Sequence, residues 1–182
     1  LRLTKNHGKA CDLLDVSFGG GKTHSLVLLY HLFKNKELGS KFIKENNIAK
    51  KYGIEQIPDV DVVAIDCRQM KKQTLWGEIA DRLGKFDEFK KLDEERKPPT
   101  DISKIKSLFS KPTLLMLDEV PHYLVKTKSE GIHFTEASLL FLTELVSAIN
   151  TTDYTRLIIT TTAEQKLLQD TSDKVKKIAS LD

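Results

Sequence analysis

The sequence contains few of the residues that mark disulfide-bonded, low-complexity or membrane proteins. Its 2 cysteines, Cys11 and Cys67, are too few for a disulfide framework and favour a reducing, cytoplasmic setting. Its 9 glycines and 5 prolines among 182 residues exclude a collagen-like or low-complexity chain. The longest apolar runs, such as residues 26–30 and 139–142, are far shorter than the ~20 residues of a membrane span. We therefore expect a cytoplasmic protein with no membrane contact.

The composition indicates one folded domain with a nearly balanced charge. Hydrophobic residues make up 40% and charged residues 30% of the chain, which permits a core and argues against intrinsic disorder. The net charge of +3 is too small to indicate nucleic-acid binding by itself. We expect residues 1–182 to form a single domain, with residues 1–10 as an upstream extension and 163–182 as a helical tail. Because the chain starts at Leu1 rather than Met, we also expect it to be part of a longer protein.

Hydrophobic periodicity predicts strands that alternate with helices. Four short apolar runs are predicted to be strands: residues 11–18, 60–65, 113–117 and 156–161. Apolar residues at helical spacing predict helices at 22–36, 74–83, 102–109, 135–149 and 163–181, with Thr135 as an N-cap and 126–131 as a polar loop. The lysine-rich segment 34–52 is predicted to be a solvated helix or helix-turn, although its lysines could also follow a phosphate backbone. This alternation predicts a three-layer α-β-α fold with a mostly parallel sheet.

The clearest motif is a glycine-rich turn, Gly19-Gly20-Gly21-Lys22-Thr23, between the first predicted strand and the following helix. This context is what a phosphate-binding P-loop requires, because glycines let backbone N–H groups point at phosphate oxygens beside a helix N-terminus. Lys22 would reach the β- and γ-phosphates, and the Thr23 hydroxyl would ligate Mg²⁺. The full pattern has a glycine where this chain has Val16. The alternative is a turn whose lysine is only solvated.

A pair of acidic residues, Asp118-Glu119, follows the apolar strand 113–117. Ligands of open α/β sheets bind at the carboxyl ends of the strands, where these residues are expected. Asp118 would hold Mg²⁺, in the Walker B role, and Glu119 would orient and polarise the attacking water. An acidic pair after a strand can also be a simple helix cap. Together with the glycine-rich turn, it predicts Mg²⁺-dependent ATP hydrolysis.

With these two motifs the chain resembles the AAA+/RecA-like branch of P-loop NTPases, in which a catalytic glutamate follows the Walker B aspartate. The resemblance implies an extra strand between the P-loop strand and the Walker B strand, with a polar sensor at its tip. Strand 156–161 ends in Thr160-Thr161-Thr162, and Thr161 is the preferred sensor, although threonines also commonly end strands. The resemblance implies that ATP contacts the turn and the first helical residues: Phe18, Gly19, Gly20, Gly21, Lys22, Thr23 and His24.

Three strings give a narrower resemblance: FGGGKTHSL at 18–26, TLWGEIA at 74–80 and LDEVPHYL at 117–124. They are similar to an uncharacterised prokaryotic family of large predicted ATPases, catalogued as a domain of unknown function. Its members are often encoded beside DNA methyltransferases in gene clusters thought to restrict foreign DNA. The resemblance spans roughly residues 18–161. It implies ATPase activity in a larger assembly and a defence role, and it identifies no substrate.

Weaker candidates lie close to these motifs. Asp66 ends the middle strand and could assist the Mg²⁺ site or cap the strand, and His24 could touch a phosphate or be structural. His122 and Tyr123 could face the nucleotide or pack elsewhere. The two cysteines have no spacing that suggests a zinc site.

The chain has no arginine after Arg156, and no fifth strand or helical lid is predicted after residue 162. An arginine that stabilises the transition state therefore has to come from the remainder of the polypeptide or from a neighbouring subunit, and we expect a domain that is incomplete at its C-terminus and hydrolyses ATP slowly in isolation. The alternatives are a nucleotide-binding regulatory or scaffold module without turnover, and a DNA translocase motor. No Asn-Lys-x-Asp guanine motif is present, which favours ATP over GTP.

Overall fold

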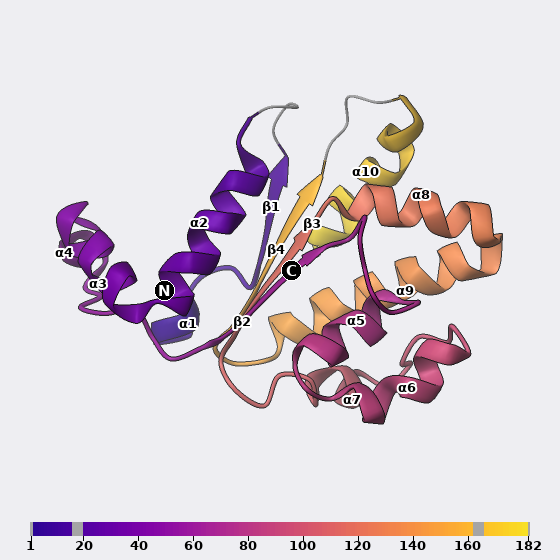
Figure 1. Cartoon of the computed structure of the whole chain (residues 1–182), viewed down its shortest axis with the longest axis horizontal. Coiled ribbons are helices and arrows are strands. Elements are labelled where there is room, and N and C mark those ends of the chain that lie inside the picture. Colours follow the sequence, from indigo (N-terminus) through magenta and orange to yellow (C-terminus); the bar gives the residue numbers. More distant parts are fainter. Residues whose placement is uncertain (1, 16–19, 162–165, 182) are drawn as a thin grey trace.

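The structure, a computed structural model, describes residues 2–15, 20–161 and 166–181. The described residues form one parallel sheet between two layers of helices, as predicted (Figure 1). The strand order is β1-β4-β3-β2. The strands are β1 (Cys11–Asp15), β2 (Asp61–Asp66), β3 (Thr113–Asp118) and β4 (Thr155–Thr161).

The last strand in the sequence, β4, lies between β1 and β3. Leu157 of β4 pairs with Cys11 on one side and with Leu115 on the other. The predicted extra strand between the first strand and the strand of the acidic pair is therefore confirmed. The described part of the first strand ends at Asp15, and Val16, Phe18 and Gly19 lie outside the described residues.

The helices cover the two faces of the sheet unequally (Figure 1). One face carries α1 (Arg2–Lys5), α2 (Lys22–Lys34), α3 (Lys36–Glu45) and α4 (Ile48–Tyr52). The other face and its surroundings carry α5 (Leu75–Arg82), α6 (Phe86–Glu94), α7 (Ile102–Lys106), α8 (Val120–Glu130), α9 (Ile132–Asn150) and α10 (Lys166–Ala179). The lysines of α3 and α4 are exposed, as expected of a solvated face.

The central strand β3 is buried along its whole length because it contributes to both cores. Leu114 and Met116 pack with Leu26 of α2 in the smaller core. Leu115 and Leu117 point to the opposite face and join the larger core around α5 and α9. Side chains of a strand alternate between faces, so the apolar run at 113–117 supplies both layers at once.

The first residues pack against the end of the sheet opposite the strand tips. Leu3 is buried in the smaller core with Leu26. The Arg2 guanidinium donates hydrogen bonds to the carbonyl oxygens of Ile149, Asn150, Thr152 and Thr155. These carbonyls include the end of α9, where a cation is favoured by the helix dipole. The segment predicted to be an upstream extension thus contacts the end of α9 and the start of β4.

Two local predictions near α8 and α9 are wrong. Residues 126–130, predicted to begin a polar loop, continue helix α8, which ends at Glu130 before Gly131. Buried Thr127 satisfies its hydroxyl by donating to the carbonyl oxygen of Leu124. Thr135 is a buried residue inside α9 and not its N-cap, because the helix begins at Ile132 after Gly131. Polar side chains bonded within their own helix made these segments look like a loop and a cap.

Helix α9 is, among the described residues, the one helix long and apolar enough to cross a membrane. Half of its apolar window is buried inside the protein. Its buried residues, such as Phe141 and Leu145, belong to the larger core. Length and hydropathy are therefore weak evidence for a membrane span, since a core helix passes the same test.

Replacing Phe141 by Ala is expected to lower the free energy of unfolding by roughly 3–5 kcal/mol. Phe141 is fully buried, and its ring lies 5.4 Å from the ring of buried Trp76. The matched control is Leu140→Ala, because Leu140 is the preceding residue of α9 and is 46% exposed. Guanidinium unfolding curves of both variants test the prediction. An equal loss of unfolding free energy in the two variants would show that the face of α9 with Phe141 is not turned to the core.

Candidate functional site

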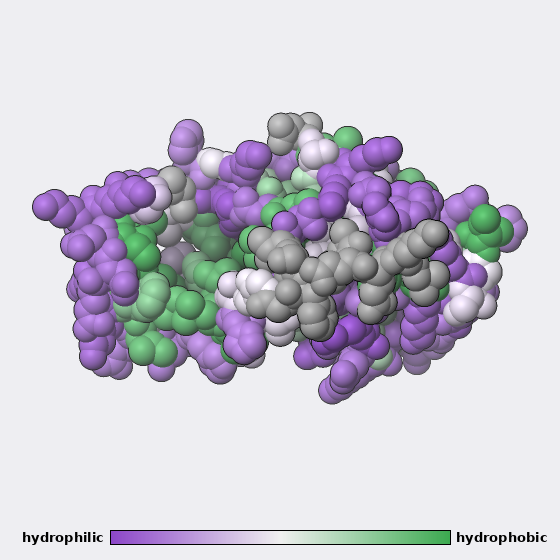
Figure 2. All heavy atoms as spheres, turned by 90° about the horizontal axis from the view of Figure 1, so that it is seen from above, coloured by the Kyte–Doolittle hydropathy of each residue, from purple (hydrophilic) through white to green (hydrophobic). Residues whose placement is uncertain are grey.

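All four strands end in acidic or hydroxyl residues at the same end of the sheet. Because the strands are parallel, their carboxyl ends lie together, at the upper end of the sheet in Figure 1. The residues at the strand ends are Asp15, Asp66, Asp118, Thr160 and Thr161. Figure 2 looks down on this end, and hydrophobic surface is visible on the side where Figure 1 places α2, α3 and α4. The strand ends therefore form a polar region above an apolar sheet.

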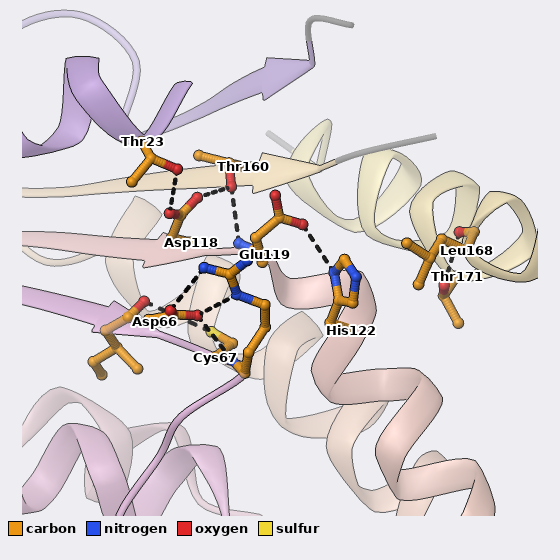
Figure 3. A network of polar contacts seen from close by, with 11 residues as sticks. Thr23, Asp66, Cys67, Asp118, Glu119, His122, Thr160, Leu168 and Thr171 are labelled. Carbon is orange, nitrogen blue, oxygen red and sulfur yellow. Dashed lines mark hydrogen bonds and ion pairs between the residues drawn. The ribbon is translucent and has the colours of Figure 1, made fainter. Parts of the chain in front are cut away.

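The start of α2 and the acidic pair meet at this end of the sheet (Figure 3). The Thr23 hydroxyl donates a hydrogen bond of 2.8 Å to Oδ2 of Asp118, across 95 positions of sequence. Thr23 lies in the first turn of α2, which begins after Gly21. Gly21 has a φ of 76°, a conformation that glycine adopts without the penalty paid by residues with a Cβ. The two residues predicted to ligate Mg²⁺, Thr23 and Asp118, thus lie in contact in the structure.

Lys22 is the first residue of α2 and is only 7% exposed. The pKa of Asp15 at the end of β1 is lowered, and the largest cause is a hydrogen bond from Lys176 of α10, whose Nζ lies 2.7 Å from Oδ2 of Asp15. The charge of Lys22 makes a smaller contribution in the same direction. Lys22 therefore lies within electrostatic reach of the strand ends. Of the other residues predicted to bind nucleotide, Gly20 and His24 are exposed, and Phe18 and Gly19 lie outside the described residues.

Thr160, not the preferred Thr161, contacts the acidic pair. Its hydroxyl donates to Oδ1 of Asp118 at 2.5 Å and accepts the backbone N–H of Glu119 at 2.9 Å. Thr161 points to the opposite face and donates to Oδ1 of Asp15 at 2.9 Å. Neighbouring residues of a strand face opposite ways, so only one of the two can lie beside Asp118. Thr162 lies outside the described residues.

Glu119 has a left-handed backbone, with φ 59° and ψ 42°, at the junction of β3 and α8. A residue other than glycine pays on the order of 1–3 kcal/mol for such a conformation, and such strain gathers at functional sites. The hydrogen bond from its backbone N–H to Thr160 helps to hold it. Its carboxylate is 2.9 Å from Nδ1 of His122, in the first turn of α8. Glu119 is thus fixed at the tip of β3 with its carboxylate directed to His122 (Figure 3).

Of the two aromatic candidates after the acidic pair, only His122 lies at the site. Tyr123 is buried, and its hydroxyl is 2.9 Å from Oγ of Ser138 and accepts the N–H of Leu75. Burial raises the pKa of Tyr123 to about 12. Tyr123 therefore belongs to the packing between α5, α8 and α9.

The end of β2 adds a third carboxylate beside the acidic pair. Asp66 pairs in register with Asp118, and the N–H of Cys67 donates to the Asp118 carbonyl oxygen at 2.9 Å. Arg68 holds the Asp66 carboxylate through two hydrogen bonds of 2.9 Å, from Nε and Nη2. This pairing keeps the pKa of Asp66 below its ordinary value. Cys67 is fully buried, and burial raises its thiol pKa well above the ordinary value.

A cleft of about 470 Å³ opens beside α2 and β2, next to the acidic residues. Thr23, Asp66 and Asp118 lie along it together with Lys34 and Arg82. A larger cavity of about 670 Å³ lies among α1 to α4 and the opposite end of the sheet, and none of the predicted site residues lines it. The smaller cleft is therefore the one connected to the predicted chemistry.

The family model of the DUF499 N-terminal domain matches residues 2–177. The chain belongs to this family. The sequence predicts membership in an uncharacterised family that is described as a domain of unknown function, and this part of the prediction is confirmed. No curated protein and no solved structure matches the chain. The function of this DUF499 domain therefore has to be argued from the site.

Two residues of the DUF499 domain site were not found from the sequence. Arg68 was not singled out, although an Asp-x-Arg string at the end of a strand is a signal for a carboxylate–guanidinium pair. Asp15 belongs to none of the sequence motifs, yet at the tip of β1 it accepts a hydrogen bond from Thr161 and pairs with Lys176. The contacts of Asp15 join segments that are neighbours because of the strand order, whereas the Arg68–Asp66 pair is local.

Proposed function

We propose that this DUF499 domain binds Mg·ATP at the carboxyl end of the sheet and hydrolyses it. The observation that carries the proposal is the contact of Thr23 with Asp118, with Glu119 as the next residue. A hydroxyl at a helix start and a carboxylate at a strand end are the side chains that hold the magnesium of a bound nucleotide in P-loop enzymes.

The donor atoms at this position fit Mg²⁺. Thr23 and Asp118 supply hard oxygen ligands already in contact with each other. Among the described residues no group of three or more His, Cys, Asp or Glu side chains could hold a metal ion. Mg²⁺ needs no such group, because it is usually held by one or two carboxylates, substrate phosphates and water. When bound, it would neutralise charge on the β- and γ-phosphates.

The start of α2 provides the phosphate-binding part. Backbone N–H groups at a helix N-terminus attract phosphate, and α2 has no acidic side chain in its first turn to compete. Lys22 adds a full positive charge at the same place. Phe18 and Gly19 are proposed to extend this contact, with Gly20, Gly21 and His24. ATP is proposed over GTP because the chain has no guanine-binding motif.

Glu119 is proposed as the base for the attacking water. The water oxygen forms a bond to the γ-phosphorus as the bond from that phosphorus to the bridging oxygen breaks, and ADP leaves with the bonding electron pair. The proton of the water passes to the Glu119 carboxylate. Thr160 keeps Asp118 and Glu119 in a fixed relation through its two hydrogen bonds. Thr160 is therefore proposed as the polar sensor, the role that was predicted from the sequence for Thr161.

A non-hydrolysing nucleotide-binding module is the second candidate. It is favoured by the contact of the Glu119 carboxylate with His122, which occupies the group that would activate water. The two candidates differ in turnover and not in binding, so they are separated by the Glu119 variant described below.

The wider setting is proposed from the family resemblance. We propose a cytoplasmic module that works with the remainder of its polypeptide or with neighbouring subunits, in defence against foreign DNA. If the domain is a DNA translocase, DNA should raise its ATPase rate, and this stimulation should fall as the salt concentration rises. Stimulation of equal size by a neutral polymer would contradict it.

The isolated chain is expected to release ADP from ATP in the presence of Mg²⁺ and not in the presence of EDTA. The rate is expected to stay well below about one per second, the lower end of ordinary enzyme turnover, because the Glu119 carboxylate is held in contact with His122. Steady-state ADP release and calorimetric ATP binding test this. The absence of nucleotide binding at millimolar ATP would contradict the proposed function.

A further inference from the structure

Arg68 places a guanidinium beside the acidic residues at the strand ends. The backbone next to it is fixed, since the N–H of Cys67 is bonded to the carbonyl oxygen of Asp118. The side chain grips both oxygens of Asp66, with Nε 2.9 Å from Oδ1 and Nη2 2.9 Å from Oδ2. Asp66 itself is in register with Asp118. Arg68 is therefore hydrogen-bonded to Asp66, which lies beside Asp118, the proposed Mg²⁺ ligand.

The position of Arg68 combines attraction with access. Its side chain is 47% exposed, so the guanidinium is open to the solvent above the sheet. Its pKa is raised, first by the hydrogen bonds to Asp66 and further by the charges of Glu119 and Asp118. The guanidinium thus interacts electrostatically with the acidic pair while it is hydrogen-bonded to Asp66.

The chain's other arginines are each paired with other groups, although Arg82 also lines the cleft beside Thr23 and Asp118. Arg2 is bonded to backbone carbonyls at the opposite end of the sheet. Arg82 pairs with Glu78, Arg96 with Glu130, and Arg156 with Asp12. Arg68 is the arginine hydrogen-bonded to the acidic strand ends. The lack of arginine after Arg156 therefore does not leave the site without a guanidinium.

We propose that Arg68 supplies the arginine of the ATPase site from within the same chain. Asp66 holds the guanidinium when no nucleotide is bound, and the γ-phosphate takes over from Asp66 when Mg·ATP binds. The exchange is chemically matched, because the planar guanidinium makes the same two-pronged hydrogen bonds to carboxylate and to phosphate. In the transition state it would stabilise charge on the γ-phosphate oxygens. This assignment rests on the proposed function.

The test compares Arg68→Ala and Arg68→Lys with a matched control, Arg96→Ala. Arg96 also pairs with a carboxylate, that of Glu130, and has similar exposure at 41%. We expect Arg68→Ala to lower kcat at least about 100-fold, since an arginine at a phosphoryl-transfer site contributes roughly 10³–10⁵-fold. Arg68→Lys is expected to recover little of the loss, because an ammonium cannot make the two-pronged contact. Arg96→Ala is expected to keep the wild-type kcat.

A binding measurement distinguishes a role of Arg68 in the transition state from a purely structural role in the segment after β2. Calorimetry is done with Mg·ADP alone and with Mg·ADP plus fluoroaluminate, which mimics the transferring phosphoryl group. Arg68→Ala is expected to weaken the fluoroaluminate complex at least tenfold and to leave the Kd for Mg·ADP within about threefold. Equal weakening of both complexes would overturn the proposal, since it is the result of a structural role.

A second variant tests the exchange itself. Asp66→Asn keeps the size of the side chain and removes its charge, so Arg68 is released. We expect the fluoroaluminate complex to become tighter, because the guanidinium no longer has to leave a charged partner, and an unchanged or weaker complex would overturn the exchange. If the wild type hydrolyses ATP and Arg68→Ala has the same kcat, the assignment of Arg68 is overturned and the proposed function is not. A wild type that binds no nucleotide would overturn the proposed function, and the assignment with it.

Discussion

Replacing Glu119 by Gln is expected to lower kcat for ATP about 10²–10⁴-fold and to leave the Kd for Mg·ATP unchanged. The size of the effect is that of a lost general base, because an amide cannot accept the proton of the attacking water. Glutamine keeps the length of the side chain and can still hydrogen-bond to His122. The backbone hydrogen bond from Glu119 to Thr160 is untouched. Single-turnover hydrolysis and calorimetric binding of ATP measure the two quantities.

The control for this variant is Glu136→Gln on α9, where the carboxylate is 67% exposed and far along the chain from the acidic pair. It removes the same charge and is expected to keep the wild-type kcat. A Glu119→Gln variant as active as the control would rule out Glu119 as the base. If the wild type binds ATP without turnover and the variant does the same, the regulatory module is the better description.

Replacing Lys22 by Met is expected to raise the Kd for Mg·ATP about 10–100-fold and to reduce ATP hydrolysis below detection. A charged hydrogen bond to phosphate contributes roughly 1.5–3 kcal/mol, which corresponds to that range of Kd. Lys22 is 7% exposed and is the first residue of α2, at the helix end where the phosphates are proposed to bind. Methionine retains the length of the side chain and removes the charge. Isothermal titration with Mg·ATP measures the change.

The matched control is Lys41→Met on α3, outside the cleft beside Thr23 and Asp118. Lys41 is exposed and its Nζ lies 3.8 Å from Oε1 of Glu45, so the variant removes one lysine charge without changing the first turn of α2. Its Kd for Mg·ATP is expected to match that of wild type. Equal weakening by both substitutions would mean that the domain attracts nucleotide only through its total charge. Lys22 would then have no place in a phosphate-binding turn.

The arrangement of Thr23 and Asp118 was predictable because it depends on local patterns and on one general rule. The apolar run before Asp118 predicts a buried parallel strand, and the glycines before Lys22 predict a turn into a helix. Parallel strands bring their carboxyl ends to one end of a sheet, so both motifs had to lie there. The distance of 2.8 Å between the two side chains agrees with that rule.

The helix boundaries near α8 and α9 were not predictable in the same way. Polar residues such as Thr127 and Thr135 favour loops and caps when only neighbours in sequence are considered. In the structure both are buried, and Oγ1 of Thr127, which donates to the carbonyl oxygen of Leu124, lies 3.3 Å from Oγ1 of Thr135. Burial with a satisfied hydroxyl reverses the local preference, and it depends on how α8 packs against α9.

The sequence by itself determined the α/β class, the buried parallel strands and the meeting of the glycine-rich turn with the acidic pair. Each of these follows from periodicity and strand direction, which are local properties. Only the tertiary structure decided that Thr160 and not Thr161 contacts Asp118, and that Asp66, with Arg68 bonded to it, lies beside Asp118. These facts depend on register and side-chain direction, and a shift of one residue in a strand turns every side chain to the other face.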